Sequence, residues 1–362
     1  MNAMTDLTVD VAGGLPAEQD LVLRAAPGDP EFREGVNIWL QDDAGRFAFP
    51  RFGVEAIGRS WDRRGVQANI AFPDGRVLVG SSVGEVVGPL DDSGEATVFG
   101  AGPIEFRCVE PFRRWTMSFA GPVVDTTVAD QVAGVVDEGK LVEAAVEVEL
   151  TMAVPPWIRG EASDETRRRL AGSDEALFIG GVGGFNCKQL FRATGVLRVG
   201  DDEMAFTATG LRVHRKGVRK TADFRGHCWQ SAVFPGGRAF EALAFPEPAD
   251  GGPAYTEGFV FDSGRVYPAT VSQAPWMSSF VPHGGDVSLV LDSELGTTRI
   301  TGLTRASTAM PGTAATSKIA VMSSGASRHN LFFHQGSAEY SWDGESAYGM
   351  IERSLPVDKV GV

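Results

Sequence analysis

The stretch TGLRVHRKGVRKTADFRGHCWQSAVFPGGRAF occupies residues 209–240, and YTEGFVFDSG follows at residues 255–264. Both segments read as short strands with alternating patterning, broken by Gly, Asp and Pro. Side chains two apart in a strand point to the same face, so His227 and Trp229 share a face, as do Tyr255 and Glu257. If that face borders a cavity, an acid, an aromatic wall and hydrogen-bonding groups meet in one pocket. We take this stretch as the predicted functional centre.

The same pattern continues outward through most of the chain. Short alternating runs end at Gly-, Asp- and Pro-containing turns, and the sequence holds 45 Gly and 20 Pro. The run at residues 141–154 alternates Val and Leu with Glu, which is typical of a strand with one wet face. The letters show no long amphipathic helix, so α/β architectures are disfavoured. The pattern predicts an all-β protein built from barrels or sandwiches, with few short helices such as residues 161–171.

Length and composition shifts divide the chain. At about 150 residues per domain, 362 residues suggest two domains. A Pro-Pro pair at residues 155–156 and the charged run after it mark the predicted boundary. The predicted parts are a 1–30 N-terminal extension, a 31–155 β domain, a 156–175 linker or lid, and a 176–362 C-terminal β domain.

Charge and cysteine usage narrow the class of protein. A net charge of −14 argues against nucleic acid and against an anionic membrane surface. Three Cys without metal-ligand spacing favour a reducing compartment. We expect no metal, no cofactor, no signal peptide and no membrane span, hence a cytoplasmic protein. Its expected partner is a hydrophobic small molecule, and the oligomeric state stays open.

Glu257 is the predicted proton donor of the functional centre. Burial in an apolar pocket raises a carboxyl pKa, and a neutral carboxylic acid can protonate a substrate. Tyr255 and His227 would hold that donor or a water in place. The Trp229 ring would shield a developing cation. The alternative interpretation is an aromatic core strand with Glu257 on its wet side.

Three further side chains are predicted to bind substrate. Arg225 lies two residues before His227 and so shares its face. Trp276 and Met277 follow a Pro and combine two adaptable apolar side chains, which suits the mouth of a cavity. The alternatives are a solvated basic face for Arg225 and ordinary packing for Trp276 and Met277.

His227-x-Trp229 followed by Tyr255-x-Glu257 resembles the pattern of the carotenoid 1,2-hydratases. These belong to a two-domain lipocalin-like superfamily with AttH-like proteins, kievitone hydratase and fungal decalin-forming Diels–Alderases. The resemblance implies two packed lipocalin-like β-barrel or β-sandwich domains without a cofactor. It also implies that His227, Trp229, Tyr255 and Glu257 form the active site. This chain carries Glu where the family has Asp, and its gap between the two pairs is one residue longer.

The predicted function is that of a cofactor-independent lyase or isomerase, similar to a hydratase or a cyclase. Its substrate would be a large hydrophobic molecule, such as an isoprenoid, steroid or polyketide, protonated by a buried carboxylic acid. One alternative is a non-catalytic carrier of hydrophobic ligands. A second is a pericyclic cyclase, similar to a Diels–Alderase, whose pocket only folds the substrate.

Overall fold

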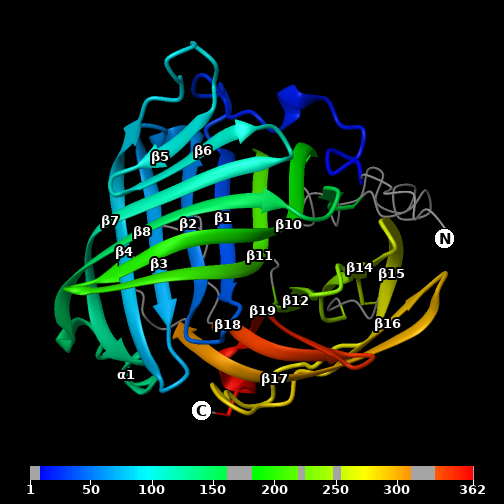
Figure 1. Cartoon of the computed structure of the whole chain (residues 1–362). Coiled ribbons are helices and arrows are strands. Elements are labelled where there is room, and N and C mark those ends of the chain that lie inside the picture. The colour runs from blue at the N-terminus through cyan, green and yellow to red at the C-terminus, as the bar shows by residue number, and fades with distance from the viewer. Residues whose placement is uncertain (1–8, 161–181, 219–224, 248–253, 311–330, 362) are drawn as a thin grey trace.

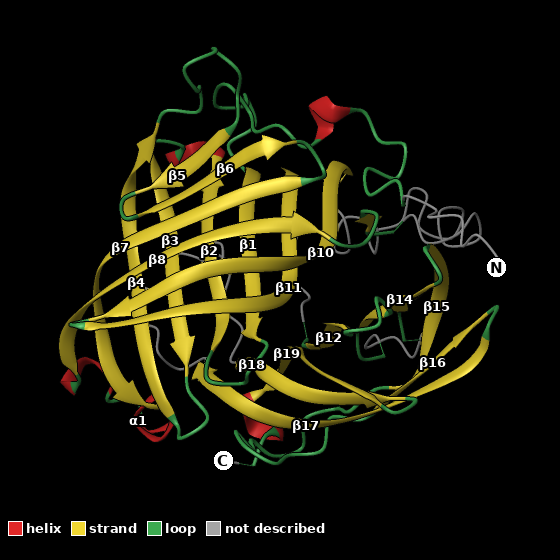
Figure 2. Ribbon diagram, viewed as in Figure 1, coloured by secondary structure: helices red, strands yellow, loops and turns green. Residues whose placement is uncertain are grey.

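The computed structural model of the chain describes residues 9–160, 182–218, 225–247, 254–310 and 331–361. It is 65% strand and 6% helix, which confirms the predicted all-β class (Figure 2). The helical pieces are η1 (Ala17–Gln19), η2 (Gly58–Ser60), α1 (Val128–Ala133), η3 (Val136–Glu138) and η5 (Val357–Lys359). None of the helices in these ranges is long and apolar enough to cross a membrane. The helix expected at residues 161–171 lies outside the described residues.

The first half of the chain supplies the strands β1 (Phe32–Asp42), β2 (Ala48–Ile57), β3 (Arg63–Ala71), β4 (Arg76–Val87), β5 (Val98–Ala101), β6 (Ile104–Glu110), β7 (Arg114–Thr127), β8 (Lys140–Met152) and β9 (Trp157–Ile158). The second half supplies β10 (Val182–Val199), β11 (Asp202–Val218), β12 (His227–Val233), β13 (Ala239–Ala244), β14 (Thr256–Asp262), β15 (Arg265–Gln273), β16 (Leu289–Ser293), β17 (Gly296–Met310), β18 (Leu331–Trp342) and β19 (Glu345–Pro356).

The first barrel runs from β1 through β4 to β7, β8, β10 and β11, and β11 pairs back onto β1 (Figure 1). The hairpin of β5 and β6 lies between β4 and β7 in the sheet order. The alternation expected for residues 141–154 is present in β8, whose even-numbered side chains from Ala144 to Met152 are buried while Glu147 and Glu149 are exposed. This inward face packs with Phe49, Phe52 and Phe106 in the barrel core.

Two strands of the first barrel come from the region assigned to the C-terminal domain. β10 pairs with β8, and β11 pairs with β1 from Phe32↔Val218 to Asp42↔Ala208. The predicted start of the second domain at residue 176 is therefore wrong. The first barrel needs these two strands to close, because without them β1 and β8 would present unpaired edges. The change of barrel falls between Val218 and His227.

The linker predicted at residues 156–175 also begins later than expected. Pro155 and Pro156 are half-buried, and β9 follows at once. Trp157 and Ile158 of β9 pair with Lys188 and Cys187 of β10, so pairing resumes directly after the two prolines. Residues 161–175 of the predicted linker or lid lie outside the described residues.

The second barrel contains β12 to β19 in chain order, closed by pairing of β12 with β19. Its interior packs side chains such as Phe240, Leu289, Tyr340 and Ile351. A separate apolar cluster joins the two barrels, combining Trp39 and Leu211 of the first with Trp229 and Phe259 of the second. The outer faces of both barrels thus form a buried seam between them, and this seam carries the predicted functional centre.

Candidate active site

The strand register of the second barrel sets the row of side chains that faces the seam. Across four neighbouring strands, Glu352 pairs with Trp229, Trp229 with Leu243, and Leu243 with Glu257. Paired residues of antiparallel strands point to the same side of the sheet. Trp229 and Glu257 therefore share one face, as the i, i+2 spacing predicts.

All four predicted catalytic side chains are buried, with exposed fractions of 6% for His227, 5% for Trp229, 3% for Tyr255 and 1% for Glu257. They lie between the two barrels and not inside either one. The reason is alternation: the neighbours Cys228 and Gln230 point into the second barrel, so His227 and Trp229 point out of it.

Glu257 is held by groups from both barrels. The Tyr255 hydroxyl donates to Glu257 Oε2 at 2.7 Å, and the Gly160 amide donates to the same oxygen at 3.0 Å. The Lys188 ammonium of β10 donates to Glu257 Oε1 at 3.3 Å, and Arg159 Nε lies 3.7 Å from that oxygen. Both oxygens of Glu257 are thus engaged by donors or cations.

Glu241 of β13 is the second carboxyl at this place. Its Oε1 accepts from Lys188 Nζ and from Trp229 Nε1, each at 2.5 Å. Its exposed fraction is 0%, and its Oε2 has no hydrogen-bond partner among the described residues. We call Lys188, Glu241, Glu257, Tyr255 and Trp229 the lysine–carboxylate cluster.

The two carboxyls of this cluster differ in pKa. Burial raises the pKa of Glu257, but the charges of Lys188 and Arg159 outweigh burial and lower it below the ordinary value. The predicted protonated Glu257 is therefore wrong. Burial raises the pKa of Glu241, and the nearby Glu257 anion raises it further against the pull of Lys188. One lysine serves two carboxyls, and Glu241 is the one that retains a proton to higher pH.

Two cations lie close to the Trp229 ring. Lys188 Nζ is 5.7 Å and the Arg159 guanidinium 6.0 Å from the centroid of its ring. The Trp39 ring of the first barrel meets it edge-on at 5.0 Å. Both distances to the cations are within cation–π range, so the ring face already interacts with positive charge.

His227 belongs to a neighbouring network. Its Nδ1 faces Ser354 Oγ at 2.7 Å and its Nε2 faces Glu352 Oε1 at 2.9 Å. Gln335 donates to the other oxygen of Glu352. The Phe245 ring lies between this network and the cluster, 6.3 Å from His227 and 6.1 Å from Tyr255 by ring centroids. His227 therefore shares the seam with Glu257 without joining its hydrogen bonds.

The three predicted substrate-binding residues are placed apart from one another. Arg225 is half-buried just before β12. Trp276 is exposed and Met277 is buried against Ala309 and Phe332, at an end of the second barrel. The neighbouring Pro275 carbonyl contacts Cys228, on the opposite side of β12 from Trp229. Trp276 and Met277 thus lie away from the lysine–carboxylate cluster.

Sequence reasoning missed Lys188, Glu241 and Arg159. Two of them carry a readable signal: Lys188 is the one charge in FNCKQLF, and Glu241 is the one charge in the apolar run AFEALAF. A charge in such a strand is costly to bury unless it is paired. The partners could not be read, since β10 and β13 belong to different barrels.

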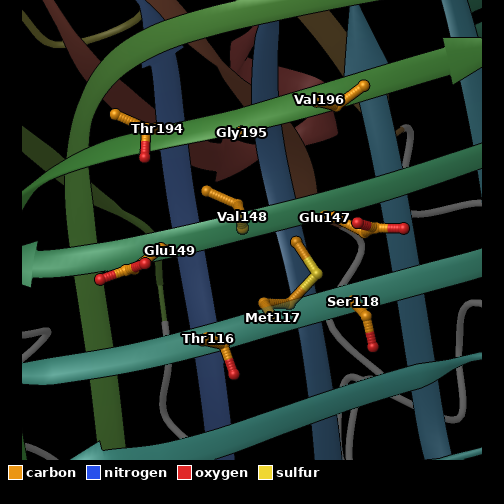
Figure 3. A pocket seen from close by; sticks show the side chains of 9 residues that line it. All are labelled: Thr116, Met117, Ser118, Glu147, Val148, Glu149, Thr194, Gly195 and Val196. Atoms are coloured by element: carbon orange, nitrogen blue, oxygen red, sulfur yellow. The ribbon is translucent and has the colours of Figure 1, made fainter.

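No group of three His, Cys, Asp or Glu side chains in the described part of the chain is arranged to hold a metal ion. An open hollow lies elsewhere, on the outer wall of the first barrel over β7, β8 and β10 (Figure 3). Thr116, Ser118, Glu147 and Glu149 line it, with none of the cluster residues. It carries no acid–base pair of the kind found in the seam.

Comparisons with known proteins place the fold. A family model described as a domain of unknown function (DUF7064) matches residues 18–356. No curated protein matches the chain. The AttH-type protein of Nitrosomonas europaea has a TM-score of 0.53 at 14% identity, covering 93% of this chain and 99% of that one.

Two further solved structures are similar to the chain. CghA, in its structure with Sch210972, has a TM-score of 0.53 at 10% identity over 90% of this chain and 89% of that one. Kievitone hydratase from Nectria haematococca has a TM-score of 0.43 at 10% identity, covering 92% and 93%. The AttH-type protein and CghA share the fold of this chain, in agreement with the predicted architecture of two β-barrels.

Proposed function

Since the chain belongs to the DUF7064 family, whose description assigns no activity, we propose a function from the seam itself. We propose a cofactor-independent lyase or isomerase that acts on a large hydrophobic substrate by proton transfer from Glu241. The observation that carries this is the buried carboxyl pair around Lys188, with Glu241 Oε2 unpartnered among the described residues. Pairs of titratable groups with pKa values pushed apart mark acid and base roles.

The proposed first step is transfer of the Glu241 proton to a substrate double bond. The C=C π electrons take the proton, a C–H bond forms, and the substrate becomes a carbocation while Glu241 becomes an anion. Lys188, at 2.5 Å from Glu241 Oε1, stabilises that anion. Trp229 donates to the same oxygen through Nε1, so its ring stays fixed beside the reacting group.

The second step removes the positive charge. In a hydration, a water oxygen bonds to the cation and its proton passes to a base; in an isomerisation or cyclisation, a neighbouring C–H gives up the proton instead. The His227–Glu352 pair is the proposed base for water. Glu352 Oε1 accepts a hydrogen bond from His227 Nε2 and so orients the imidazole ring. Proton return to Glu241 completes the cycle without a cofactor.

The seam also contains polar atoms suited to a bound molecule. Trp39 Nε1 and Trp157 Nε1 are buried and, among the described residues, have no hydrogen-bond partner. Buried donors in folded proteins are nearly always satisfied, by protein, water or ligand. Aromatic walls with a few polar atoms are typical of sites for apolar small molecules.

Solvent deuterium separates the proposed chemistry from its alternatives. The protein is incubated with apolar polyenes in ²H₂O, and recovered molecules are analysed by mass spectrometry. Proton transfer places one deuterium on carbon in the product, and Glu241→Gln lowers turnover by about 10²–10⁴. A pericyclic cyclase would give product without deuterium, and a carrier would return the polyene unchanged. Either of these two results would refute the proposal.

A further inference from the structure

Arg353 is a buried cation in the interior of the second barrel. It lies on β19, between Glu352 and Ser354, which face the seam, so its own side chain points inward. Only 4% of the residue is exposed. Charged side chains are almost never this buried unless they are paired.

The hydrogen-bond partners of Arg353 are neutral. Its guanidinium donates to the Pro275 carbonyl at 3.3 Å and to His334 Nδ1 at 3.0 Å. His334 Nε2 lies 2.8 Å from Ser307 Oγ, whose hydroxyl donates to the Pro282 carbonyl. His334 thus accepts at one nitrogen and donates at the other, as a neutral imidazole does. Burial and then the Arg353 charge lower its pKa well below the ordinary value.

The charge of Arg353 has no matching carboxylate within ion-pair distance among the described residues. The acid that attracts it, Asp286, is exposed and uses Oδ1 to accept from the Ser288 amide and hydroxyl. Cys228 is close, but burial raises the pKa of its thiol to about 12, so it is uncharged. Arg353 Nε is buried and unpartnered within the same described ranges.

An apolar wall adjoins this cation. Met277, Ala309, Phe332 and Val360 form one buried cluster, with the Phe280 ring packed against it. The Phe280 centroid is 5.0 Å from that of His334 and 5.1 Å from that of Phe332. Trp276 and Val281, on the same segment, reach the surface with exposed fractions of 40% and 38%.

We propose that the end of the second barrel covered by residues 275–282 binds an amphiphilic monocarboxylate. Its carboxylate would take the unpaired Nε edge of Arg353, and its chain would lie along Met277, Phe280 and Phe332. A guanidinium binds a carboxylate through charge-assisted hydrogen bonds, which are roughly twice as strong as neutral ones. The site is separate from the seam and does not depend on the function proposed for it.

Calorimetry on the full chain tests this site with two probes of equal length, decanoate and decanol. We expect the wild type to bind decanoate at least about tenfold more tightly than decanol, the usual worth of a hydrogen bond to a charged group. Arg353→Gln should lose this preference, while Arg353→Lys, which keeps a cation, should retain part of it. Arg305→Gln is the matched control, since Arg305 pairs with Glu339 on the outside of the same barrel.

Several outcomes would overturn the proposal. Equal affinity for both probes would show that Arg353 recognises no carboxylate. Absence of decanoate binding to the folded wild type would leave only a water or a small ion at Nε. A decanoate preference lost in Glu241→Gln but kept in Arg353→Lys and Arg353→Gln would place the carboxylate in the seam. If Arg353→Gln does not fold, the affinities of wild type and Arg353→Lys for decanoate and decanol still show whether Arg353 binds the carboxylate.

Discussion

At the residue scale, the two carboxyls of the lysine–carboxylate cluster give stability opposite dependences on pH. The Glu257 pKa is lowered on folding, so its contribution to stability is present above its unfolded value and is lost as pH falls. The Glu241 pKa is raised from 4.5 on folding, so the folded protein holds this proton more tightly than the unfolded chain does. The protein therefore loses stability as pH rises above 4.5.

Substituting Glu241 or Glu257 by Gln should reveal the two opposite pH dependences of stability. As pH rises above about 4.5, Glu241→Gln should gain stability relative to the wild type, whereas the stability deficit of Glu257→Gln should stay constant there and shrink as pH falls below about 4.5, each change being up to about 1.4 kcal/mol per pH unit. Urea denaturation at a series of pH values measures this. Each variant is the control for the other, because both replace a Glu of the lysine–carboxylate cluster by Gln. Parallel slopes would contradict the assignment of the proton to Glu241.

Side-chain alternation explains what could be predicted at this scale. His227 with Trp229 and Tyr255 with Glu257 lie on shared faces because the strand period is two. The sign of the Glu257 pKa shift could not be predicted, since it depends on Lys188 and Arg159, which come from elsewhere in the chain. Burial was inferred correctly, but burial alone does not fix the direction of a pKa shift.

At the element scale, the start of β12 depends on a glycine. Gly226 has a φ of +110°, and a Cβ there would lie 2.1 Å from the Ser354 carbonyl oxygen of β19. The next residue, His227, pairs with Ser354 in the ladder. A side chain at position 226 would therefore push apart the two strands that hold the His227 network.

Gly226→Ala should destabilise the protein more than Gly237→Ala. Gly237 has a φ of +94°, but a Cβ there would meet nothing within 4 Å. Both substitutions carry a backbone cost of roughly 1–2 kcal/mol, and the clash at 226 adds about 1–3 kcal/mol. Chemical denaturation compares them. Equal losses would show that β12 and β19 separate without cost at this point.

Local patterns predicted most strands, including β8, because turns and alternation are short-range features. They could not assign a strand to a barrel. β10 and β11 follow the Pro-Pro pair and looked like the start of a new domain, yet they close the first barrel. Which edges meet is decided by pairing partners far apart in the sequence, such as Asp42 and Ala208.

At the scale of the whole molecule, the seam couples the two barrels. Trp39 of the first barrel meets Trp229 of the second, and Lys188 bridges to Glu241. Arg192 of β10 also donates to the Phe234 carbonyl at 2.8 Å. Because groups of both barrels are buried together, we expect the chain to unfold in one cooperative transition.

Trp39→Ala should weaken that coupling, since losing a buried Trp costs about 3–5 kcal/mol. Circular dichroism and tryptophan fluorescence should then report different unfolding midpoints. Phe52→Ala is the control: Phe52 is buried in the core of the first barrel, and its loss should lower one shared midpoint. Coincident midpoints in Trp39→Ala would mean that the seam does not set cooperativity.

The central claim is that Glu241 carries a proton beside the Glu257 anion, and infrared spectroscopy tests it most directly. Among the described carboxyls with a shifted pKa, only that of Glu241 is raised, while those of Glu55, Glu257 and Glu352 are lowered. In a titration upward from acid pH, the account predicts a carboxylic-acid C=O band that outlasts those of the other carboxyls, disappears in Glu241→Gln and persists in Glu257→Gln. A wild-type spectrum without that band, or a band lost in Glu257→Gln instead, would contradict the account.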